Sequence, residues 1–109
     1  MFYINEIVNI NKKFAKGIVM NKSSLEFALS SIKTKAWIDQ IAYLVRAILL
    51  DHVFEDGNKR TAAVIIIIYF TELEIGFDPQ KIAEIILNII TKNINDINKI
   101  KRMIKNVIR

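Results

Sequence analysis

Residues 52–62 read His52-Val53-Phe54-Glu55-Asp56-Gly57-Asn58-Lys59-Arg60-Thr61-Ala62. This stretch holds the only histidine of the chain, one of its three glycines, and a compact run of charged and amide side chains. It lies between two strongly apolar segments, residues 41–50 (IAYLVRAILL) and residues 62–70 (AAVIIIIYF). Burying unpaired charges is unfavourable, and functional residues concentrate in loops held by a rigid scaffold. We therefore expect a charged loop between two core elements, and a functional site on that loop.

The second half of the stretch has the chemistry of a phosphate site. Gly57 permits a backbone turn that other residues resist, and Asn58, Lys59 and Arg60 follow it at the expected start of a helix. A helix N-terminus presents unpaired N–H groups and a partial positive charge, which suits an anion. Lys59 and Arg60 add full positive charges at the same place.

Two further side chains supply the chemistry of a reaction. Asp56, beside the turn, can hold Mg²⁺ with phosphate oxygens as the other ligands. His52 belongs to the residue type best suited to take a proton from a hydroxyl near neutral pH. The alternative is a helix-loop-helix corner whose charges face solvent and whose histidine is incidental. A lone His beside a lone Asp would favour that alternative, whereas the whole constellation favours a phosphate site.

The stretch resembles the signature of the Fic/Doc family, whose core reads His-x-Phe-x-Asp/Glu-Gly-Asn-Gly/Lys-Arg, and residues 52–60 match every specified position. The expected order of helices from about residue 24 to residue 90 also resembles the family, so the likeness covers most of the chain. The family moves part of a nucleotide onto a hydroxyl of a target protein. The resemblance therefore implies ATP and Mg²⁺ as cofactors and a protein as substrate.

The resemblance also implies a role for each matched residue. His52 matches the histidine that deprotonates the hydroxyl, and Asp56 matches the acidic ligand of Mg²⁺. Phe54 matches an aromatic residue that anchors the loop in the core. The implied nucleotide-binding residues are Gly57 and Asn58 in the phosphate-cradling turn, Lys59, and the phosphate-binding Arg60.

Two positions resemble the Doc branch more than the Fic branch. Fic AMP-transferases usually carry Gly where Lys59 stands, and a second Arg where this chain has Ala63. In the Doc branch the lysine occupies space that the nucleotide would otherwise use, and the resemblance implies that ATP binds in the reversed orientation. The resemblance thus implies a protein kinase that transfers the γ-phosphoryl group to a Ser or Thr hydroxyl. AMP transfer, as in Fic enzymes, is the nearest alternative.

Doc-like proteins act as growth-arresting toxins on a translation elongation factor, the one that delivers aminoacyl-tRNA, and a partner antitoxin holds them in check. Inhibited Fic proteins carry Ser/Thr-x-x-x-Glu on a helix, and this Glu pairs with the second arginine. No Ser or Thr in this chain has Glu four residues later, and Ala63 leaves no such arginine. The resemblance therefore implies a toxin controlled by an antitoxin in trans.

Composition sets the outer limits of these interpretations. The chain has 109 residues, 52% hydrophobic and 25% charged, which is typical of one globular domain covering residues 1–109. The chain has no cysteine, which excludes a disulfide framework. It has a single histidine as well, which excludes a Cys/His zinc site. No signal-peptide pattern is visible, and the longest apolar run, residues 62–70, is too short to span a bilayer. We expect a cytoplasmic protein with no membrane partner.

The net charge of +5 is concentrated in residues 91–109, where six basic side chains accompany Asp96. Residues 1–90 hold ten basic and ten acidic residues and are neutral. A basic segment of this kind can bind nucleic acid or an acidic partner. Such segments are more often a solvated helix face, so we do not expect a nucleic-acid partner. A non-enzymatic module that binds through this segment is the second alternative.

The periodicity of apolar residues predicts six helices. The first covers about residues 3–16, with Gly17 at its end, and the second follows a capping box at Ser23-Ser24-Leu25-Glu26. Residues 36–51 deliver His52 to the loop. The β-branched run at 64–70 is also compatible with a strand, but its length and the lack of a pairing partner favour a helix over 60–74 that Gly76 ends. Asp78-Pro79 and Asp96 begin the last two helices. We expect a compact six-helix all-α domain of Fic/Doc-like fold, with the motif loop between its two central helices and residues 60–74 as the hub.

Overall fold

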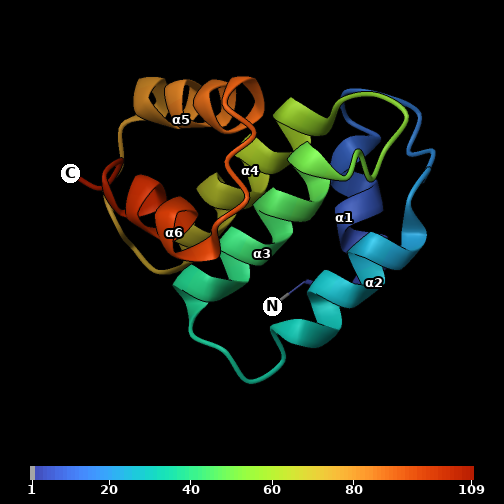
Figure 1. Ribbon diagram of the computed structural model, residues 1–109, viewed down its shortest axis with the longest axis horizontal. Helices are drawn as coiled ribbons and strands as arrows, with labels where there is room; N and C mark the ends of the chain where they lie inside the picture. The colour runs from blue at the N-terminus through green and yellow to red at the C-terminus, as the bar shows by residue number, and fades with distance from the viewer. Residues whose placement is uncertain (1) are drawn as a thin grey trace.

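Six helices and their connections make up residues 2–109, the part of the chain that this computed structural model describes (Figure 1). Two isolated antiparallel bridges, Val19 with Phe54 and Phe77 with Ile108, are the only β-type pairing among residues 2–109. The all-α prediction and the number of helices are therefore confirmed. The helices are α1 (Ile4–Asn11), α2 (Lys22–Ser31), α3 (Trp37–Leu50), α4 (Asn58–Glu72), α5 (Pro79–Thr91) and α6 (Ile97–Lys105).

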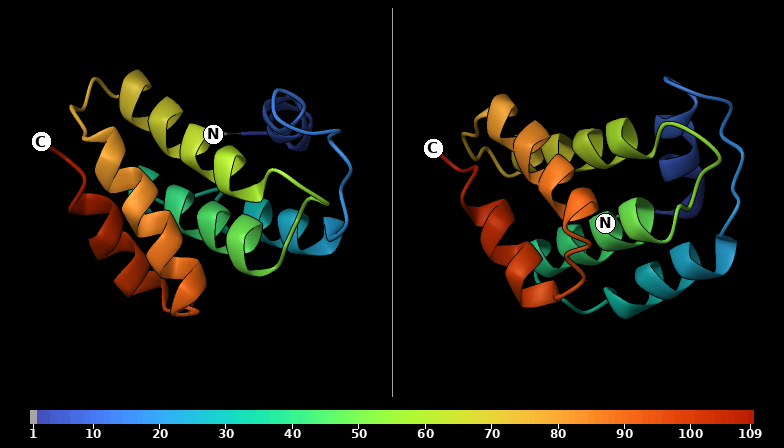
Figure 2. Two further views of the ribbon diagram at one scale, coloured as in Figure 1. Left: turned by 90° about the horizontal axis from the view of Figure 1, so that it is seen from above. Right: turned by 45° about the horizontal axis from the view of Figure 1, so that its top comes forward.

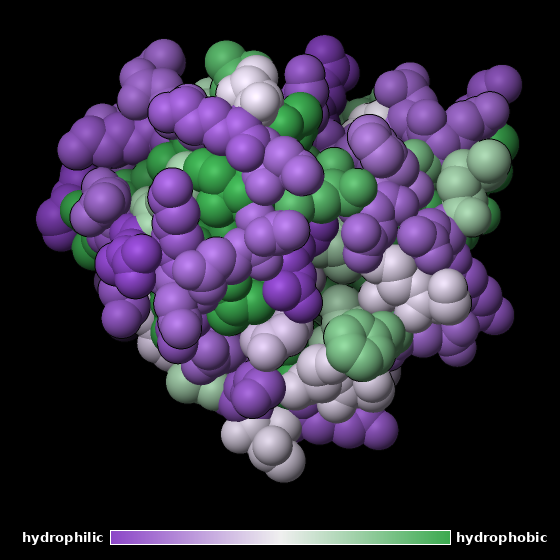
Figure 3. Space-filling view, viewed as in Figure 1, coloured by the Kyte–Doolittle hydropathy of each residue, from purple (hydrophilic) through white to green (hydrophobic). Residues whose placement is uncertain are grey.

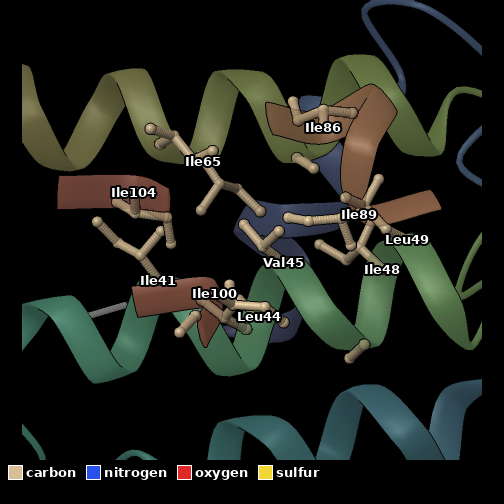
Figure 4. Close-up of a cluster of buried hydrophobic side chains, with 14 of the residues drawn as sticks. Ile41, Leu44, Val45, Ile48, Leu49, Ile65, Ile86, Ile89, Ile100 and Ile104 are labelled. Atoms are coloured by element: carbon tan, nitrogen blue, oxygen red, sulfur yellow. The ribbon is translucent and has the colours of Figure 1, made fainter. Parts of the chain in front are cut away.

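Helix α3 lies at the centre of the fold and packs against α2, α4, α5 and α6. Figure 4 shows its inward face, with Ile41, Leu44, Val45, Ile48 and Leu49 beside Ile65 of α4, Ile86 and Ile89 of α5, and Ile100 and Ile104 of α6. Eight of its 14 residues are buried, against six of 15 in α4. The prediction that residues 60–74 form the hub is therefore wrong. Helix α4 is apolar nearly all round, but Ile67 and Ile68 on one side are only half-buried.

The β-branched run Val64–Phe70 is helical, as its length predicted. Its end differs from the prediction, because Gly76 is not the helix stop. Glu74 adopts the left-handed conformation with φ 57°, and the Ile75 N–H then donates to the Phe70 carbonyl across 2.8 Å. This is the bond that closes a Schellman-type helix end, so a non-glycine residue accepts the left-handed position here.

Helices α5 and α6 begin where the sequence predicts, each at an aspartate. The Asp78 carboxylate accepts the Gln80 N–H at 3.0 Å, with Pro79 as the first helical residue. The Asp96 carboxylate accepts the Asn98 N–H at the same distance. These bonds satisfy N–H groups that have no partner within the helix.

Asp78→Ala is expected to lower the free energy of unfolding by about 1 kcal/mol, because the cap of α5 is lost. Urea titration followed by circular dichroism measures this. Glu84→Ala, an exposed change within the same helix, is the matched control and should change stability by less than about 0.5 kcal/mol. Equal midpoints for the two variants would show that the Asp78 cap contributes nothing.

The N-terminal helices differ most from their predicted bounds. Helix α1 ends at Asn11 instead of near residue 16, because the Asn11 side chain accepts the Gly17 N–H and the chain turns away. Helix α2 begins at Lys22, two residues earlier than the predicted capping box at residues 23–26 allows. Its cap is Asn21, whose side chain accepts the Ser24 N–H at 3.2 Å and also donates to the Asp51 carbonyl. The cap therefore also ties α2 to the end of α3.

The C-terminal basic segment packs through an apolar face, with Ile100 and Ile104 buried against α3 and α5. One of its lysines, Lys101, forms a 2.9 Å salt bridge to Asp39 of α3. The face seen in Figure 3 is largely hydrophilic, with hydrophobic side chains showing between the charged ones. No helix of residues 2–109 is both long enough and apolar enough to cross a membrane.

Tyr69, on the half of α4 remote from the motif loop, links α4 to α3. Its hydroxyl donates a 2.6 Å hydrogen bond to the Gln40 side chain. Burial, aided by the charge of Glu72, raises the pKa of Tyr69 to about 12. The hydroxyl therefore stays protonated and able to donate through neutral and mildly alkaline pH.

Candidate functional site

The motif loop, residues 51–57, joins the end of α3 to the start of α4 and borders a cavity of about 470 Å³. That volume is within the usual range for small-molecule sites. The structure brings to this cavity every motif residue that the sequence analysis singled out except Phe54. The lining consists of Phe14, Leu49, His52, Glu55, Asp56, Gly57, Asn58, Lys59, Arg60 and Ile90.

Gly57 is the turn residue that the sequence predicts, and it precedes the first residue of α4. Its φ is +77°, a left-handed conformation that favours glycine. A Cβ placed there would lie 3.0 Å from the Asn11 side-chain nitrogen and 3.2 Å from the Ala15 Cβ. Conformation and space therefore both require glycine at this position.

The start of α4 is open toward the cavity. The first hydrogen bond within the helix runs from the Thr61 N–H to the Gly57 carbonyl at 2.9 Å. The N–H groups of the three residues before Thr61 therefore lie ahead of the helical ladder, where a bound anion can accept from them. The cationic side chains of Lys59 and Arg60 are exposed at the same turn, and the Arg60 guanidinium carbon lies 6.0 Å from the centre of the Phe14 ring. The arrangement suits a phosphate.

Asn58 uses its side chain to close the loop. Its carbonyl oxygen accepts the Phe54 N–H at 3.0 Å, and its amide nitrogen donates to the Phe54 carbonyl at 2.9 Å. The resemblance to the Fic/Doc signature implies that Asn58 binds the nucleotide. The structure leaves its main-chain N–H for that role, because the side chain is already paired within the loop.

The rear of the loop is held in the core by Phe54, whose side chain is 1% exposed. Residues 18–21, which we call the edge segment, run beside the loop (Figure 2). The Glu55 N–H donates to the Ile18 carbonyl at 3.0 Å, and the Met20 N–H donates to the Val53 carbonyl at 2.7 Å. The loop therefore has a buried anchor and a hydrogen-bonded neighbour, as a site of fixed shape requires.

His52 follows the last turn of α3 and stands exposed at the cavity. Its φ of 48° is uncommon for a residue with a side chain, although His accepts it more readily than most. Glu74 and Asn93 adopt the same conformation one residue past the caps of α4 and α5, so this backbone belongs to the end of α3. Asp51, the residue before His52, is fixed by the Ser24 hydroxyl and by the Asn21 amide, so the end of α3 holds the histidine at a defined place.

Asp56 lies at the same cavity with an exposed carboxylate. One carboxylate oxygen accepts the Gly57 N–H at 2.8 Å. Residues 2–109 contain no cluster of three or more His, Cys, Asp or Glu side chains able to enclose a metal ion. The donor set fits Mg²⁺, which binds through one or two carboxylates and takes its other ligands from phosphates and water.

Sequence reasoning missed two groups of residues at the site. The apolar wall, Phe14, Leu49 and Ile90, comes from three separate segments that only the fold brings together. Asn11 and Thr61 are buried behind the loop and hydrogen-bonded to each other at 3.1 Å. A signal for Asn11 existed, since it takes a position on the otherwise apolar face of α1, one turn after Ile7.

The comparisons with family models, with curated proteins and with solved structures find no match to this chain. Membership of the Fic/Doc family therefore stays a prediction from the motif.

Proposed function

We propose that the cavity binds magnesium-bound ATP and that the protein transfers the γ-phosphoryl group to a Ser or Thr hydroxyl of another protein. The observation that carries this proposal is the meeting of His52, Asp56 and the cationic first turn of α4 at one cavity. A proton acceptor, a magnesium ligand and a phosphate-binding helix end are the parts that phosphoryl transfer needs. The match of residues 52–60 to the Fic/Doc signature supports the same assignment.

In the proposed reaction, the hydroxyl oxygen of the target forms a bond to the γ-phosphorus. The bond from that phosphorus to the oxygen bridging the β- and γ-phosphates breaks, and ADP leaves. His52 accepts the hydroxyl proton. The first turn of α4, with Lys59 and Arg60, binds the phosphates and stabilises the charge that moves to the leaving group. Magnesium at Asp56 would neutralise part of the phosphate charge.

The Doc-like branch of the proposal implies a biological setting as well. In that setting the protein is a toxin, its target is a translation elongation factor, and an antitoxin in trans controls it. Co-expression with a short protein encoded next to it should relieve growth arrest and yield a co-purifying complex. Toxicity that no neighbouring gene product relieves would contradict this part of the proposal.

The donor group is tested with two labelled nucleotides. The purified protein is incubated with a cell lysate and Mg²⁺, in one reaction with ATP labelled at the γ-phosphate and in another with ATP labelled at the α-phosphate. The kinase proposal predicts a labelled protein band from the γ-labelled ATP alone. Label from the α-phosphate alone would reject phosphoryl transfer and establish AMP transfer.

Lys59→Gly is expected to shift the reaction toward AMP transfer. Lys59 lies at the cavity, at the position where Fic enzymes have glycine. Removing its side chain opens space for ATP to bind in the orientation that leads to AMP transfer. The measurement is the ratio of α-label to γ-label on the target, which should rise in the variant. Lys16→Gly, an exposed lysine outside this cavity, is the control. An unchanged ratio in Lys59→Gly would show that this side chain does not choose the transferred group.

A further inference from the structure

Asn11 and Thr61 are the polar side chains that residues 2–109 bury completely, and the proposed reaction gives neither a role. They come from α1 and α4 and meet directly behind the motif loop, on the side away from solvent. Buried polar groups are retained where their hydrogen bonds fix a local structure. Because Asn11 and Thr61 lie directly behind the motif loop, the local structure that they fix is this loop.

Asn11 uses both functions of its amide. The nitrogen donates to the Asp56 carbonyl at 2.8 Å and to the Thr61 hydroxyl oxygen at 3.1 Å. The carbonyl oxygen accepts the Gly17 N–H at 2.9 Å. One side chain thus joins the end of α1, the turn before the edge segment, the motif loop and the first turn of α4.

These bonds fix the peptide that carries the proposed magnesium ligand. Asn11 holds the Asp56 carbonyl from behind, and the Gly57 N–H holds an oxygen of the Asp56 carboxylate in front. The Asn11 amide also occupies the space beside Gly57, where an added Cβ would approach its nitrogen to 3.0 Å. The direction of the carboxylate therefore depends on a residue that lies outside the motif.

We propose that Asn11 is a positioning residue that sets the Asp56 carboxylate for magnesium and thereby sets the magnesium dependence of the reaction. This inference rests on the proposed function of the cavity. Only an amide side chain at position 11 can both donate to the Asp56 carbonyl and accept the Gly17 N–H. Aspartate at position 11 would set a carboxylate oxygen against the Asp56 carbonyl oxygen, and leucine would leave the Gly17 N–H, the Thr61 hydroxyl and the Asp56 carbonyl without their partner.

The test compares the rate of transfer against Mg²⁺ concentration, at saturating ATP, for the wild type and for Asn11→Ala. The half-saturating Mg²⁺ concentration should rise by about 10- to 100-fold, the usual effect of removing a group that orients a metal ligand. The KM for ATP at saturating Mg²⁺ should change far less. Tyr69→Phe, which removes one partly buried hydrogen bond remote from the loop, is the matched control and should leave the magnesium dependence unchanged.

A second variant keeps the inference testable if Asn11→Ala does not fold. Thr61→Val removes one of the three hydrogen bonds and preserves the shape of the side chain, so it should shift the magnesium dependence in the same direction by less. If folded Asn11→Ala, or Thr61→Val in its place, keeps the wild-type magnesium dependence within about twofold, the inference is wrong.

If the proposed function is wrong, the wild-type protein will transfer no group, and this result differs from an unchanged magnesium dependence in Asn11→Ala. Amide hydrogen exchange then decides the positioning role without any activity. Exchange at Phe54 and Thr61, whose N–H groups are hydrogen-bonded within the loop and at the start of α4, should be faster in Asn11→Ala than in Tyr69→Phe, because only the first change releases the loop locally. Equal exchange at the loop in the two variants would overturn the inference.

Discussion

His52→Ala is expected to lower the rate of phosphoryl transfer by roughly 10²–10⁴-fold, the usual contribution of a general base. This corresponds to about 3–5 kcal/mol of activation free energy. The histidine is exposed at the cavity beside Asp56 and the first turn of α4, so the change removes the proton acceptor and leaves the phosphate-binding groups. The measurement is the initial rate of γ-label transfer at saturating Mg²⁺ and ATP.

The unusual backbone at this position calls for a second variant. His52 has a φ of 48°, where alanine is strained and asparagine is tolerated. His52→Asn therefore preserves the loop better than His52→Ala and equally lacks a base. Both variants should lose transfer, and His52→Asn should keep the melting temperature of the wild type. A rate in His52→Asn close to that of the wild type would exclude His52 as the proton acceptor.

Phe54→Ala is expected to lower the free energy of unfolding by about 3–5 kcal/mol, the usual effect of truncating a buried phenylalanine. The side chain is 1% exposed and is among the largest that the core encloses completely. Its main-chain N–H and carbonyl both bond to Asn58, so the change also loosens the loop. Urea unfolding followed by fluorescence of Trp37 measures the loss.

Phe27→Ala is the matched control for this change. It makes the same truncation at a side chain that is 64% exposed, and it should change stability by less than about 0.5 kcal/mol. If Phe54→Ala were no more destabilising than Phe27→Ala, Phe54 would not anchor the loop. This result would stand independently of any catalytic activity.

The later part of the fold could be predicted from sequence because local signals agree with the tertiary structure there. Asp78 and Asp96 cap helices in the structure as their positions in the sequence predict. The run at 64–70 is helical despite its β-branched residues, because α4 packs against α1, α3 and α5 and residues 2–109 contain no strand to pair with it. Tertiary packing overrode intrinsic preference at this point.

The N-terminal part could not be predicted as well, because its boundaries depend on long-range contacts. Helix α1 ends where the Asn11 side chain accepts a main-chain N–H six residues later. Asn21 caps α2 while it also bonds to the carbonyl of Asp51, a residue at the end of α3. The partners of these side chains at Asp51, Asp56 and Thr61 lie 30 to 50 residues away, so no local pattern contains them. The bond from the Ser24 N–H to Asn21 is local, and an N-cap asparagine could have indicated it.

At the site, the motif predicted which residues share a cavity because they are adjacent in the chain and surround one turn. It did not predict how each is used. The Asn58 side chain forms hydrogen bonds to the main chain of Phe54, and the Asn11 side chain donates to the Asp56 carbonyl. Phe14 and Ile90 lie far from the motif in sequence and reach the cavity only through the packing of the fold.

In the proposed function, nucleotide binds at the motif cavity, whereas in a binding module the functional surface would be the basic residues of α6 and the C-terminus. NMR titration of the ¹⁵N-labelled protein with ATP and Mg²⁺ separates them directly. We expect the amide signals of residues 52–60 to shift, together with those of Phe14, Leu49 and Ile90. If saturating ATP shifts none of these signals, or shifts only those of residues 97–109, the cavity does not bind nucleotide and the proposed function is wrong.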